Sequence, residues 1–357
     1  MSEILVRDGD VVIRELGALR RITLNRPQAL NAITLGMAET MTSFMRQWAG
    51  DPAAGAVMID GAGDRAFAAG GDIRALYDAA KSGGDLPERF WATEYRLNVL
   101  IARYPKPVIA VMDGLVMGGG VGLSAHAAHC VSTDRSVIAM PEVGIGFFPD
   151  VGVSFLLTRA HWELGAYVAL TGERLSAQGA LMCGLANSHI PSSRLGELSA
   201  ALADCRSGPE IPTVLRKFET SPMPGKIPKA LHWIMPCFSG DTIEEILEAL
   251  STCDNEAARA ALETMHKASP TSLKVTLRNL RDAAKFKRVE ECFQQDYRIA
   301  LACIAGHDFM EGIRAAIVDK DRKPAWRPDR PGDVTPEIVA RHFQSVGDLE
   351  LKFDNYS

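Results

Sequence analysis

Two carboxylates interrupt an apolar, glycine-rich stretch near the middle of the chain. The segment MPEVGIGFFPDVG spans residues 140–152 and contains Glu142 and Asp150. An ionised carboxylate is costly to bury without a partner, whereas an exposed loop seldom carries Val, Ile and two Phe at this density. Either the two acids decorate a surface loop or they face a ligand. Carboxylates that face a ligand can act as general acid, general base or nucleophile.

Two further glycine-rich segments can supply hydrogen-bond donors. FAAGGDIRAL (67–76) and MGGGVGLSA (117–125) each lead directly into a predicted helix. Glycine lets the backbone approach a ligand closely, and unpaired N–H groups at the start of a helix suit an anion or a developing oxyanion. Two such donors on one carbonyl oxygen would form an oxyanion hole. The alternative is a pair of simple strand-to-helix turns, and neither segment matches a nucleotide-binding fingerprint.

A third carboxylate, Glu94, lies on the apolar stripe of a helix predicted over residues 89–104. Apolar side chains at positions −4, +3 and +7 from it share the same helix face. In one interpretation Glu94 reaches solvent at the edge of the stripe, or pairs with Arg96 or Arg103. In the other it is buried with a raised pKa, which is typical of a functional site.

Other chemistries have less support in the sequence. HAAHC (126–130) offers two His and a Cys at helical spacing, but without a third ligand pattern downstream it predicts packing, and we expect no metal site. Ser124 stands in GLSAH, which differs from the GxSxG nucleophile elbow of serine hydrolases.

Composition narrows the class of protein. The chain has 357 residues, 47% hydrophobic and 23% charged, which is typical of a globular protein with a substantial core. The net charge is −5 without a long basic run, so a nucleic acid is not expected as partner, although a small phosphorylated ligand is compatible.

Targeting and redox signals favour an intracellular protein. Seven scattered cysteines without CxxC spacing predict a reducing compartment and no disulfide framework. The most apolar stretch, residues 108–125, contains Asp113 and several glycines and is a poor membrane span. The start, MSEILVRDGD, has neither a signal-peptide nor a transit-peptide pattern. We therefore expect a cytoplasmic protein, or one of the mitochondrial matrix if the source is eukaryotic.

Strands and helices alternate in the part of the chain that carries these residues. The patterns predict a hairpin of two strands, three further strands and, besides the helix over residues 89–104, three helices. The strands are expected at 11–16, 19–25, 54–61, 106–114 and 136–140, and the helices at 33–50, from about 72, and at 118–130. Such alternation indicates an α/β layered fold.

From about residue 210 the pattern is helical only. Helices are predicted at 241–253, 254–268, 269–286 and 288–306, followed by a proline-rich irregular tail at 319–334. Ser269 with Pro270 behind it forms a plausible helix start. A composition shift near residues 205–230 predicts a core at 1–210 and a mostly helical region at 211–357.

The order of the motifs resembles the crotonase (enoyl-CoA hydratase/isomerase) superfamily. The matching segments are LNRPQALNAIT (24–34), FAAGGDI (67–73), KPVIAVMDGLVMGGGVGLS (106–124) and MPEVGIGFFPDVG (140–152). Downstream segments are similar to those of the superfamily's 3-hydroxyacyl-CoA hydrolases: ALTGERLSAQGAL (169–181), SPTSLKVTLR (269–278) and HDFMEGIRAAIVDKDRKPAWRP (307–328). The resemblance covers essentially the whole chain. It implies a ββα spiral core that binds the bent CoA chain, completed by C-terminal helices.

The resemblance also implies a set of site residues. The N–H groups of Gly71 and Gly119 would form the oxyanion hole for a thioester carbonyl. The carbonyl of Ala69 would meet the adenine ring, and the neighbouring Gly70 would contact the substrate. Arg26 and Arg74 are candidates for the CoA phosphates from their position alone.

One departure from the superfamily pattern separates two reactions. Hydratases of the superfamily carry a catalytic glutamate two residues after the glycine run, where this chain has Gly122. The hydrolases share this glycine and the spacing of Glu142 and Asp150. In them Glu142 would attack the carbonyl to form a mixed anhydride or would activate water, and the sequence leaves both routes open. Asp150 would bind the 3-hydroxyl of the substrate, and Glu94 would contact the same polar end.

The expected activity is therefore hydrolysis of a short 3-hydroxyacyl-CoA. The candidates are 3-hydroxyisobutyryl-CoA, from valine breakdown, and 3-hydroxypropionyl-CoA, with no cofactor because CoA is part of the substrate. Two alternatives stay open: an enoyl-CoA isomerase or other superfamily reaction with Glu142 as the base, and a non-catalytic acyl-CoA-binding protein. The resemblance also implies a homo-oligomer, although the C-terminal helices could cover that surface.

Overall fold

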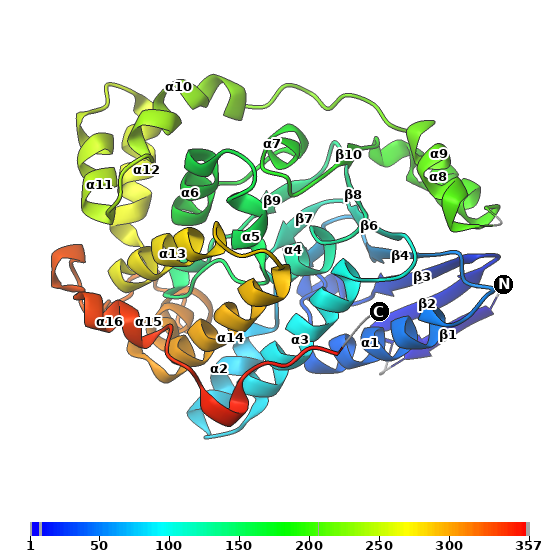
Figure 1. Cartoon of the computed structure of the whole chain (residues 1–357), viewed down its shortest axis with the longest axis horizontal. Helices are drawn as coiled ribbons and strands as arrows, with labels where there is room; N and C mark the ends of the chain where they lie inside the picture. The colour runs from blue at the N-terminus through cyan, green and yellow to red at the C-terminus, as the bar shows by residue number, and fades with distance from the viewer. Residues whose placement is uncertain (1, 7–8, 206, 355–357) are drawn as a thin grey trace.

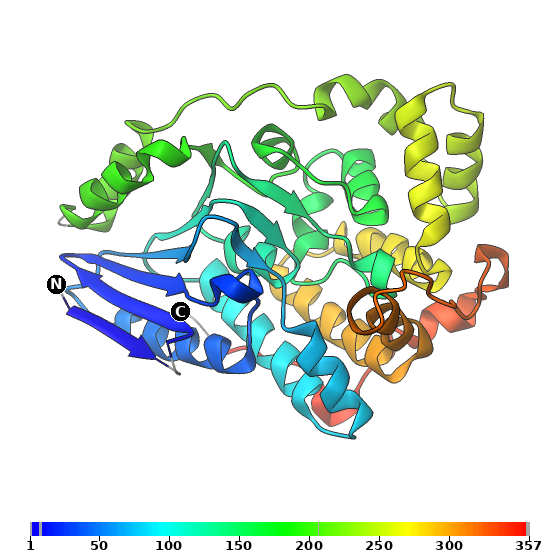
Figure 2. The same ribbon diagram turned by 180° about the vertical axis from the view of Figure 1, so that it is seen from behind.

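Strands and helices share the first part of the chain, and helices alone build the rest (Figure 1). The computed structural model describes residues 2–6, 9–205 and 207–354. Strands β1 to β4 lie at one side of the molecule, and helices α11 to α16 lie at the opposite side (Figure 1). Figure 2 shows, from behind, the long connection between α9 and α10 that leads from one part to the other.

The larger sheet has seven strands in the order β1-β2-β3-β4-β6-β8-β10. Their bounds are β1 (Ser2–Val6), β2 (Val11–Leu16), β3 (Leu19–Leu24), β4 (Ala56–Gly61), β6 (Val108–Met112), β8 (His129–Ser132) and β10 (Ser188–His189). β1, β2 and β3 pair antiparallel, and the remaining neighbours pair parallel. The predicted hairpin of β2 and β3 is confirmed, with Gly17 at φ +59° in its turn.

The smaller sheet positions the site. It consists of three parallel strands, β5 (Ala66–Ala69), β7 (Leu115–Met117) and β9 (Val137–Ala139). Each strand runs directly into one of the three glycine-rich segments of the sequence. Because parallel strands have their carboxyl ends at the same edge of a sheet, the three segments meet there.

Helices cover the sheets and extend beyond them. In the first 240 residues these are α1 (Leu35–Ala49), α2 (Ile73–Lys81), α3 (Leu86–Ala102), α4 (Gly119–Ser124), α5 (Val153–Leu157), α6 (Trp162–Thr171), α7 (Ala177–Met182), α8 (Leu195–Ala203), α9 (Ile211–Arg216) and α10 (Ile227–Cys237). The apolar face of α1 is buried as its spacing predicts, with Met37, Met41 and Met45 fully enclosed.

The predicted C-terminal helices are confirmed. They are α11 (Ile243–Thr252), α12 (Glu256–Lys267), α13 (Pro270–Ala283) and α14 (Val289–Ala305). Two further helices, α15 (His307–Ile313) and α16 (Pro336–Arg341), were not predicted. Ser269 caps α13, since its Oγ accepts a hydrogen bond from the N–H of Ser272 at 3.1 Å. A π-helical turn, Arg314–Val318, follows α15.

The helical region packs on the core that carries the site. α14 contacts α3, and α15 contacts the 3-10 turn η2 (Glu142–Ile145). A Cβ at Gly312 would overlap the backbone of Ile145, so the two segments pack closely. One hydrophobic cluster contains buried side chains of both parts, among them Phe148 and Phe309. The division at residue 210 stays a prediction, and Arg206 in the boundary stretch lies outside the described residues.

Two sequence predictions need correction or completion. The helix expected over residues 118–130 is wrong beyond Ser124, because His129 and Cys130 pair with β6 as part of β8. Strands β1, β5, β7, β8 and β10 were not expected, because segments of two to five residues are too short to show a clear alternation. Across the described ranges, no helix has both the length and the apolar character required to cross a bilayer.

Candidate active site

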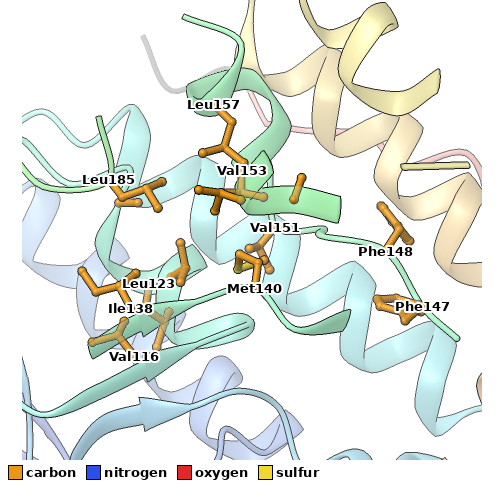
Figure 3. Close-up of a cluster of buried hydrophobic side chains, with 14 of the residues drawn as sticks. Val116, Leu123, Ile138, Met140, Phe147, Phe148, Val151, Val153, Leu157 and Leu185 are labelled. Atoms are coloured by element: carbon orange, nitrogen blue, oxygen red, sulfur yellow. The ribbon is translucent and has the colours of Figure 1, made fainter. Parts of the chain in front are cut away.

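A cavity of about 200 Å³ lies where the three strands of the smaller sheet end. Its lining includes every residue predicted for the site: Ala69, Gly70, Gly71, Glu94, Gly119, Glu142 and Asp150. The three glycine-rich segments and helix α3 therefore converge on one enclosed space. Figure 3 shows the buried side chains of β7, α4, β9 and residues 140–157 that pack together beside it.

The first two glycine segments present free backbone donors. Ile33 N–H donates to the Gly70 carbonyl at 2.9 Å, and Asp72 N–H donates to the Ile33 carbonyl at 2.9 Å. This bridge leaves the N–H of Gly71 unused. Within the described part of the chain, the amides of Gly71 and Gly119 donate to no protein group. Both line the cavity, as donors of an oxyanion hole would.

Carboxyl groups flank the glycine run that precedes α4. A Cβ at Gly119 would overlap Glu94 Oε1, and a Cβ at Gly118 would lie 3.1 Å from Glu142 Oε1. Gly118 also has φ +49°, which favours glycine. Glycine is therefore required at position 118 by the backbone conformation and at position 119 by the space that Glu94 occupies. The run also forms the turn between strand and helix.

Glu142 begins the turn η2 and is almost completely buried. Its side chain is 7% exposed, and its Oε2 has no hydrogen-bond partner among the described residues. Burial raises the pKa of Glu142 well above its usual range, and the nearby Asp150 raises it further. A carboxylate with a raised pKa is a stronger base at neutral pH. The interpretation of Glu142 as a surface group is wrong.

Asp150 faces the same cavity and has one clear partner. Tyr95 Oη donates to Asp150 Oδ2 at 2.7 Å. Burial raises the pKa of Asp150 to about 7, and the Tyr95 hydrogen bond partly opposes this shift. Asp150 also raises the pKa of Glu142 and of Glu94. The carboxyl groups of Asp150, Glu142 and Glu94 therefore titrate as a coupled group, in which ionisation of one disfavours ionisation of the others.

Glu94 is buried and not at the edge of its helix. Its side chain is 2% exposed, and burial raises its pKa well above the usual range. Arg96 donates instead to the backbone of Ala92 and Lys352, and Arg103 pairs with Glu290 at 2.9 Å. The alternative of a solvent-exposed or arginine-paired glutamate is therefore wrong.

The raised pKa of Asp150 predicts a pH-dependent cost in stability. Between the unfolded pKa, about 4, and the folded value, the native state binds more protons, so wild-type stability falls as pH rises through this window. Asp150→Asn cannot titrate and still accepts the Tyr95 hydrogen bond. The free energy of unfolding of Asp150→Asn minus that of wild type should therefore increase by about 2–4 kcal/mol from pH 4 to pH 8, as measured by urea titrations. A constant difference would contradict the buried, protonated state.

Apolar side chains close the cavity, and several were not predicted. Ile145 and Phe147 come from GIGFF, as expected, whereas Phe148 packs into the core. Trp91 stacks on Phe147 with ring centroids 5.5 Å apart. Further unpredicted lining residues are Ile73, Phe90 and Ile317. Tyr95 was missed as well, because a tyrosine next to Glu94 has no distinguishing spacing.

Position 122 is a glycine, and the packing around it leaves no room for an acidic side chain. A Cβ at this position would lie 2.6 Å from Asn98 Nδ2 and 2.8 Å from Val151 Cβ. Contacts below 3 Å require a neighbour to move, and Val151 is itself fully buried. A second carboxylate on α4 is thus excluded by the packing as well as by the sequence.

Two arginines proposed for phosphate binding lie apart from the cavity lining. Arg26 donates to the Ala32 carbonyl at 2.7 Å and to Asp72 at 3.2 Å. Arg74 is exposed and pairs with Asp78 at 2.8 Å. Their role toward CoA stays a prediction. Ser124 donates to the Gly120 carbonyl at 2.8 Å, a structural contact within α4.

Sequence comparisons agree with one another on the family. A family model described as enoyl-CoA hydratase/isomerase matches residues 19–343. The mitochondrial 3-hydroxyisobutyryl-CoA hydrolase of Xenopus laevis is 40% identical over 359 residues, which cover 99% of this chain and 93% of that protein. The protein of the same name from Homo sapiens is 39% identical over 354 residues, with 96% and 91% covered.

Solved structures share the fold, under names of a different reaction. A carnitinyl-CoA dehydratase from Mycobacterium thermoresistibile has a TM-score of 0.92 at 41% identity, with 97% of this chain and 99% of that chain covered. An enoyl-CoA hydratase from Rhodobacter sphaeroides 2.4.1 has a TM-score of 0.90 at 39% identity, with 96% and 100% covered. The relatives thus agree on architecture, and their names divide between hydrolysis and the addition or removal of water.

Proposed function

The chain belongs to the enoyl-CoA hydratase/isomerase family, and on that premise we propose that it hydrolyses 3-hydroxyisobutyryl-CoA, a step of valine catabolism. A close 3-hydroxyacyl-CoA such as 3-hydroxypropionyl-CoA is the alternative substrate. One observation carries the proposal. The cavity joins Glu142 and Asp150 with two free backbone amides, while position 122 offers no acid and no room for one. The names of the relatives that match over nearly their full length support it.

The backbone amides activate the thioester. The N–H groups of Gly71 and Gly119 bind the carbonyl oxygen and stabilise the negative charge that develops on it. Donors of this kind contribute about 3–4 kcal/mol each to the transition state. Since the two amides have no protein partner among the described residues, they are available without rearrangement.

Glu142 carries out the step at the carbonyl carbon by one of two routes. As nucleophile, its carboxylate attacks the carbon, the C–S bond breaks, and the CoA thiolate leaves behind a mixed anhydride that water then hydrolyses. As general base, it removes a proton from water while the water oxygen attacks the carbon, and the thiolate again leaves. Both routes give the free acid and CoA, and both need the carboxylate of Glu142.

Asp150 and Glu94 recognise the polar end of the acyl group. Asp150 accepts a hydrogen bond from the substrate 3-hydroxyl. Because burial raises its pKa to about 7, Asp150 can also carry a proton and donate it to the leaving thiolate. Glu94 orients the same hydroxylated end from α3. The wall of Trp91 and Phe147 holds the small carbon skeleton and excludes water from the remaining space.

The reaction names of the solved structures are the main competing assignment. Hydration of a C=C bond in this family uses a glutamate at the position of Gly122, and here a side chain would contact Asn98 and Val151. Isomerisation of an enoyl-CoA needs Glu142 alone and is chemically compatible with the cavity. A binding protein without catalysis has no use for three acids in its acyl pocket.

Release of free thiol separates these functions. Wild-type protein should release CoA rapidly from 3-hydroxyisobutyryl-CoA and far more slowly from isobutyryl-CoA and crotonyl-CoA, when thiol is followed with a chromogenic disulfide. Product analysis of the crotonyl-CoA sample by mass spectrometry tests hydration in the same experiment. Hydrated or isomerised product without thiol release would assign the chain to the competing reactions, and binding without any product would assign it to the binding proteins.

The cellular setting follows from the substrate. The partner is an acyl-CoA ester, whose CoA moiety is consumed and released with no separate cofactor. The relatives named above are mitochondrial proteins. We place this chain in the compartment that degrades acyl-CoA esters, which is the cytoplasm of a bacterium or the mitochondrial matrix of a eukaryote.

A further inference from the structure

One peptide unit next to Asp150 is held from both sides by polar side chains. The carbonyl of Val151 accepts a hydrogen bond from His126 Nε2 at 2.8 Å. The N–H of the same peptide, on Gly152, donates to Asp296 Oδ2 at 2.8 Å. The two side chains come from the turn after α4 and from α14, so distant parts of the chain meet at this peptide.

The backbone at this point adopts an unfavourable conformation. Val151 has φ +51°, which is exceptional for a β-branched residue, and Gly152 follows with φ +71°. Such a conformation is strained and persists only where the surroundings fix it. Val151 is fully buried and belongs to the cluster of hydrophobic side chains drawn in Figure 3. A Cβ at Gly152 would lie 2.7 Å from Phe293, so glycine is required there as well.

His126 and Asp296 each present the atom that its hydrogen bond to the peptide requires. A carbonyl only accepts hydrogen bonds, so His126 carries its proton on Nε2, and desolvation lowers the pKa of this imidazole to about 4. Asp296 is completely buried, and its Oδ1 accepts from Asn279 Nδ2 at 3.1 Å. Asn279 Oδ1 in turn accepts from Gln295 Nε2 at 2.8 Å. Helices α13 and α14 thereby fix the carboxylate that receives the Gly152 N–H.

Besides the held peptide, Asp150 is fixed at its backbone by the N–H of Val153, which donates to its carbonyl at 3.0 Å. Its side chain is tied to Tyr95, and its backbone leads directly into the held peptide. If that peptide turned, the strained Val151 would relax and the Asp150 carboxyl would move relative to Glu142 and the glycine donors. None of the groups that hold the peptide lines the cavity, so they cannot touch the substrate themselves.

We propose that His126 and Asp296 are positioning residues that set the selectivity for a 3-hydroxyl group by fixing the peptide after Asp150. The proposal rests on the proposed function, because it assigns to Asp150 the contact with that hydroxyl. It explains why a buried Asp296 and a half-buried His126 converge from separate elements on one peptide next to Asp150.

Histidine variants test the proposal through selectivity. His126→Phe keeps the ring that packs 5.3 Å from Phe293 but cannot donate, whereas His126→Gln keeps a donor. The measured quantity is kcat/KM for 3-hydroxyisobutyryl-CoA divided by kcat/KM for isobutyryl-CoA. We expect this ratio to fall about tenfold in His126→Phe, to recover in His126→Gln, and to fall similarly in Asp296→Leu, which cannot accept the Gly152 N–H.

A double-mutant cycle distinguishes positioning from general destabilisation. In an Asp150→Ala background, His126→Phe should leave the ratio unchanged, because its effect passes through Asp150. Glu290→Gln is the matched control: it alters a buried acid of α14 that pairs with Arg103, and the ratio should not change. Additive effects of His126→Phe and Asp150→Ala, or equal losses on both esters, would overturn the proposal.

Hydrogen exchange tests the same peptide without any activity. The Gly152 amide should exchange much faster in His126→Phe and Asp296→Leu than in wild type, by a larger factor than the loss of global stability to urea explains. An unchanged exchange rate would overturn the role of the two side chains. If wild type releases no thiol from any ester, the proposed function fails, yet this exchange result still decides whether the peptide is held as described.

Discussion

Glu142→Gln should lose at least about a thousandfold in kcat for release of CoA from 3-hydroxyisobutyryl-CoA. The amide has the shape of the carboxyl group but can neither attack the carbonyl carbon nor take a proton from water. Binding should persist, because Gln keeps the size and polarity of the side chain, and the backbone amides and the apolar wall that hold the ester are unchanged. Steady-state kinetics give kcat, and calorimetric titration with a non-hydrolysable thioether analogue of the substrate gives the affinity.

The control for this variant is a glutamate outside the cavity. Glu263 is exposed on α12, and Glu263→Gln should retain wild-type kcat and affinity. A Glu142→Gln protein with unchanged kcat would remove Glu142 from the mechanism. A protein that loses affinity and turnover together would instead show that the carboxyl group serves mainly to bind the ester.

Asp150→Ala should abolish most of the preference for a hydroxylated acyl group. The ratio of kcat/KM for 3-hydroxyisobutyryl-CoA to that for isobutyryl-CoA should fall by about 10- to 100-fold, the value of one hydrogen bond to a charged or proton-sharing group. The plain ester makes no such contact and should lose much less. Parallel kinetics on the two esters provide the measurement.

Tyr95→Phe is the companion variant for Asp150. It leaves the carboxyl group in place and removes only the 2.7 Å hydrogen bond from Tyr95 Oη. Because that bond lowers the pKa of Asp150, its loss should raise this pKa and shift the pH profile of the hydroxylated ester toward higher pH. For Asp150→Ala itself, equal losses of kcat/KM on the two esters would contradict the contact between Asp150 and the 3-hydroxyl.

Local patterns marked the segments that line the cavity, whereas the individual roles of Gly71 and Gly119 came from the family resemblance and stay predictions. Each glycine-rich segment indicates the end of a strand, and Glu142 and Asp150 are the two acids in an otherwise apolar stretch. Parallel pairing of β5, β7 and β9 then suffices to bring the segments together. Helical periodicity placed Glu94 on the apolar stripe of its helix but left both a buried and a solvent-exposed side chain open, and the structure shows it buried.

The remaining features depend on contacts between distant segments. Ile317 reaches the cavity from a π-helical turn that has no counterpart in the hydrophobic pattern. His126 was considered only as part of a zinc pattern, and its bond to the Val151 carbonyl depends on a left-handed valine that no sequence rule anticipates. The helix predicted to residue 130 failed for a related reason, since small residues suit a short helix and a buried strand equally well.

Release of CoA thiol from 3-hydroxyisobutyryl-CoA, by wild type and Glu142→Gln at equal concentration, tests the central claim most directly. Rapid release by wild type and its near absence in the variant, with the thioether analogue bound by both, is the predicted result. No release by wild type, or equal release by the two proteins, would contradict hydrolysis by Glu142 in this cavity.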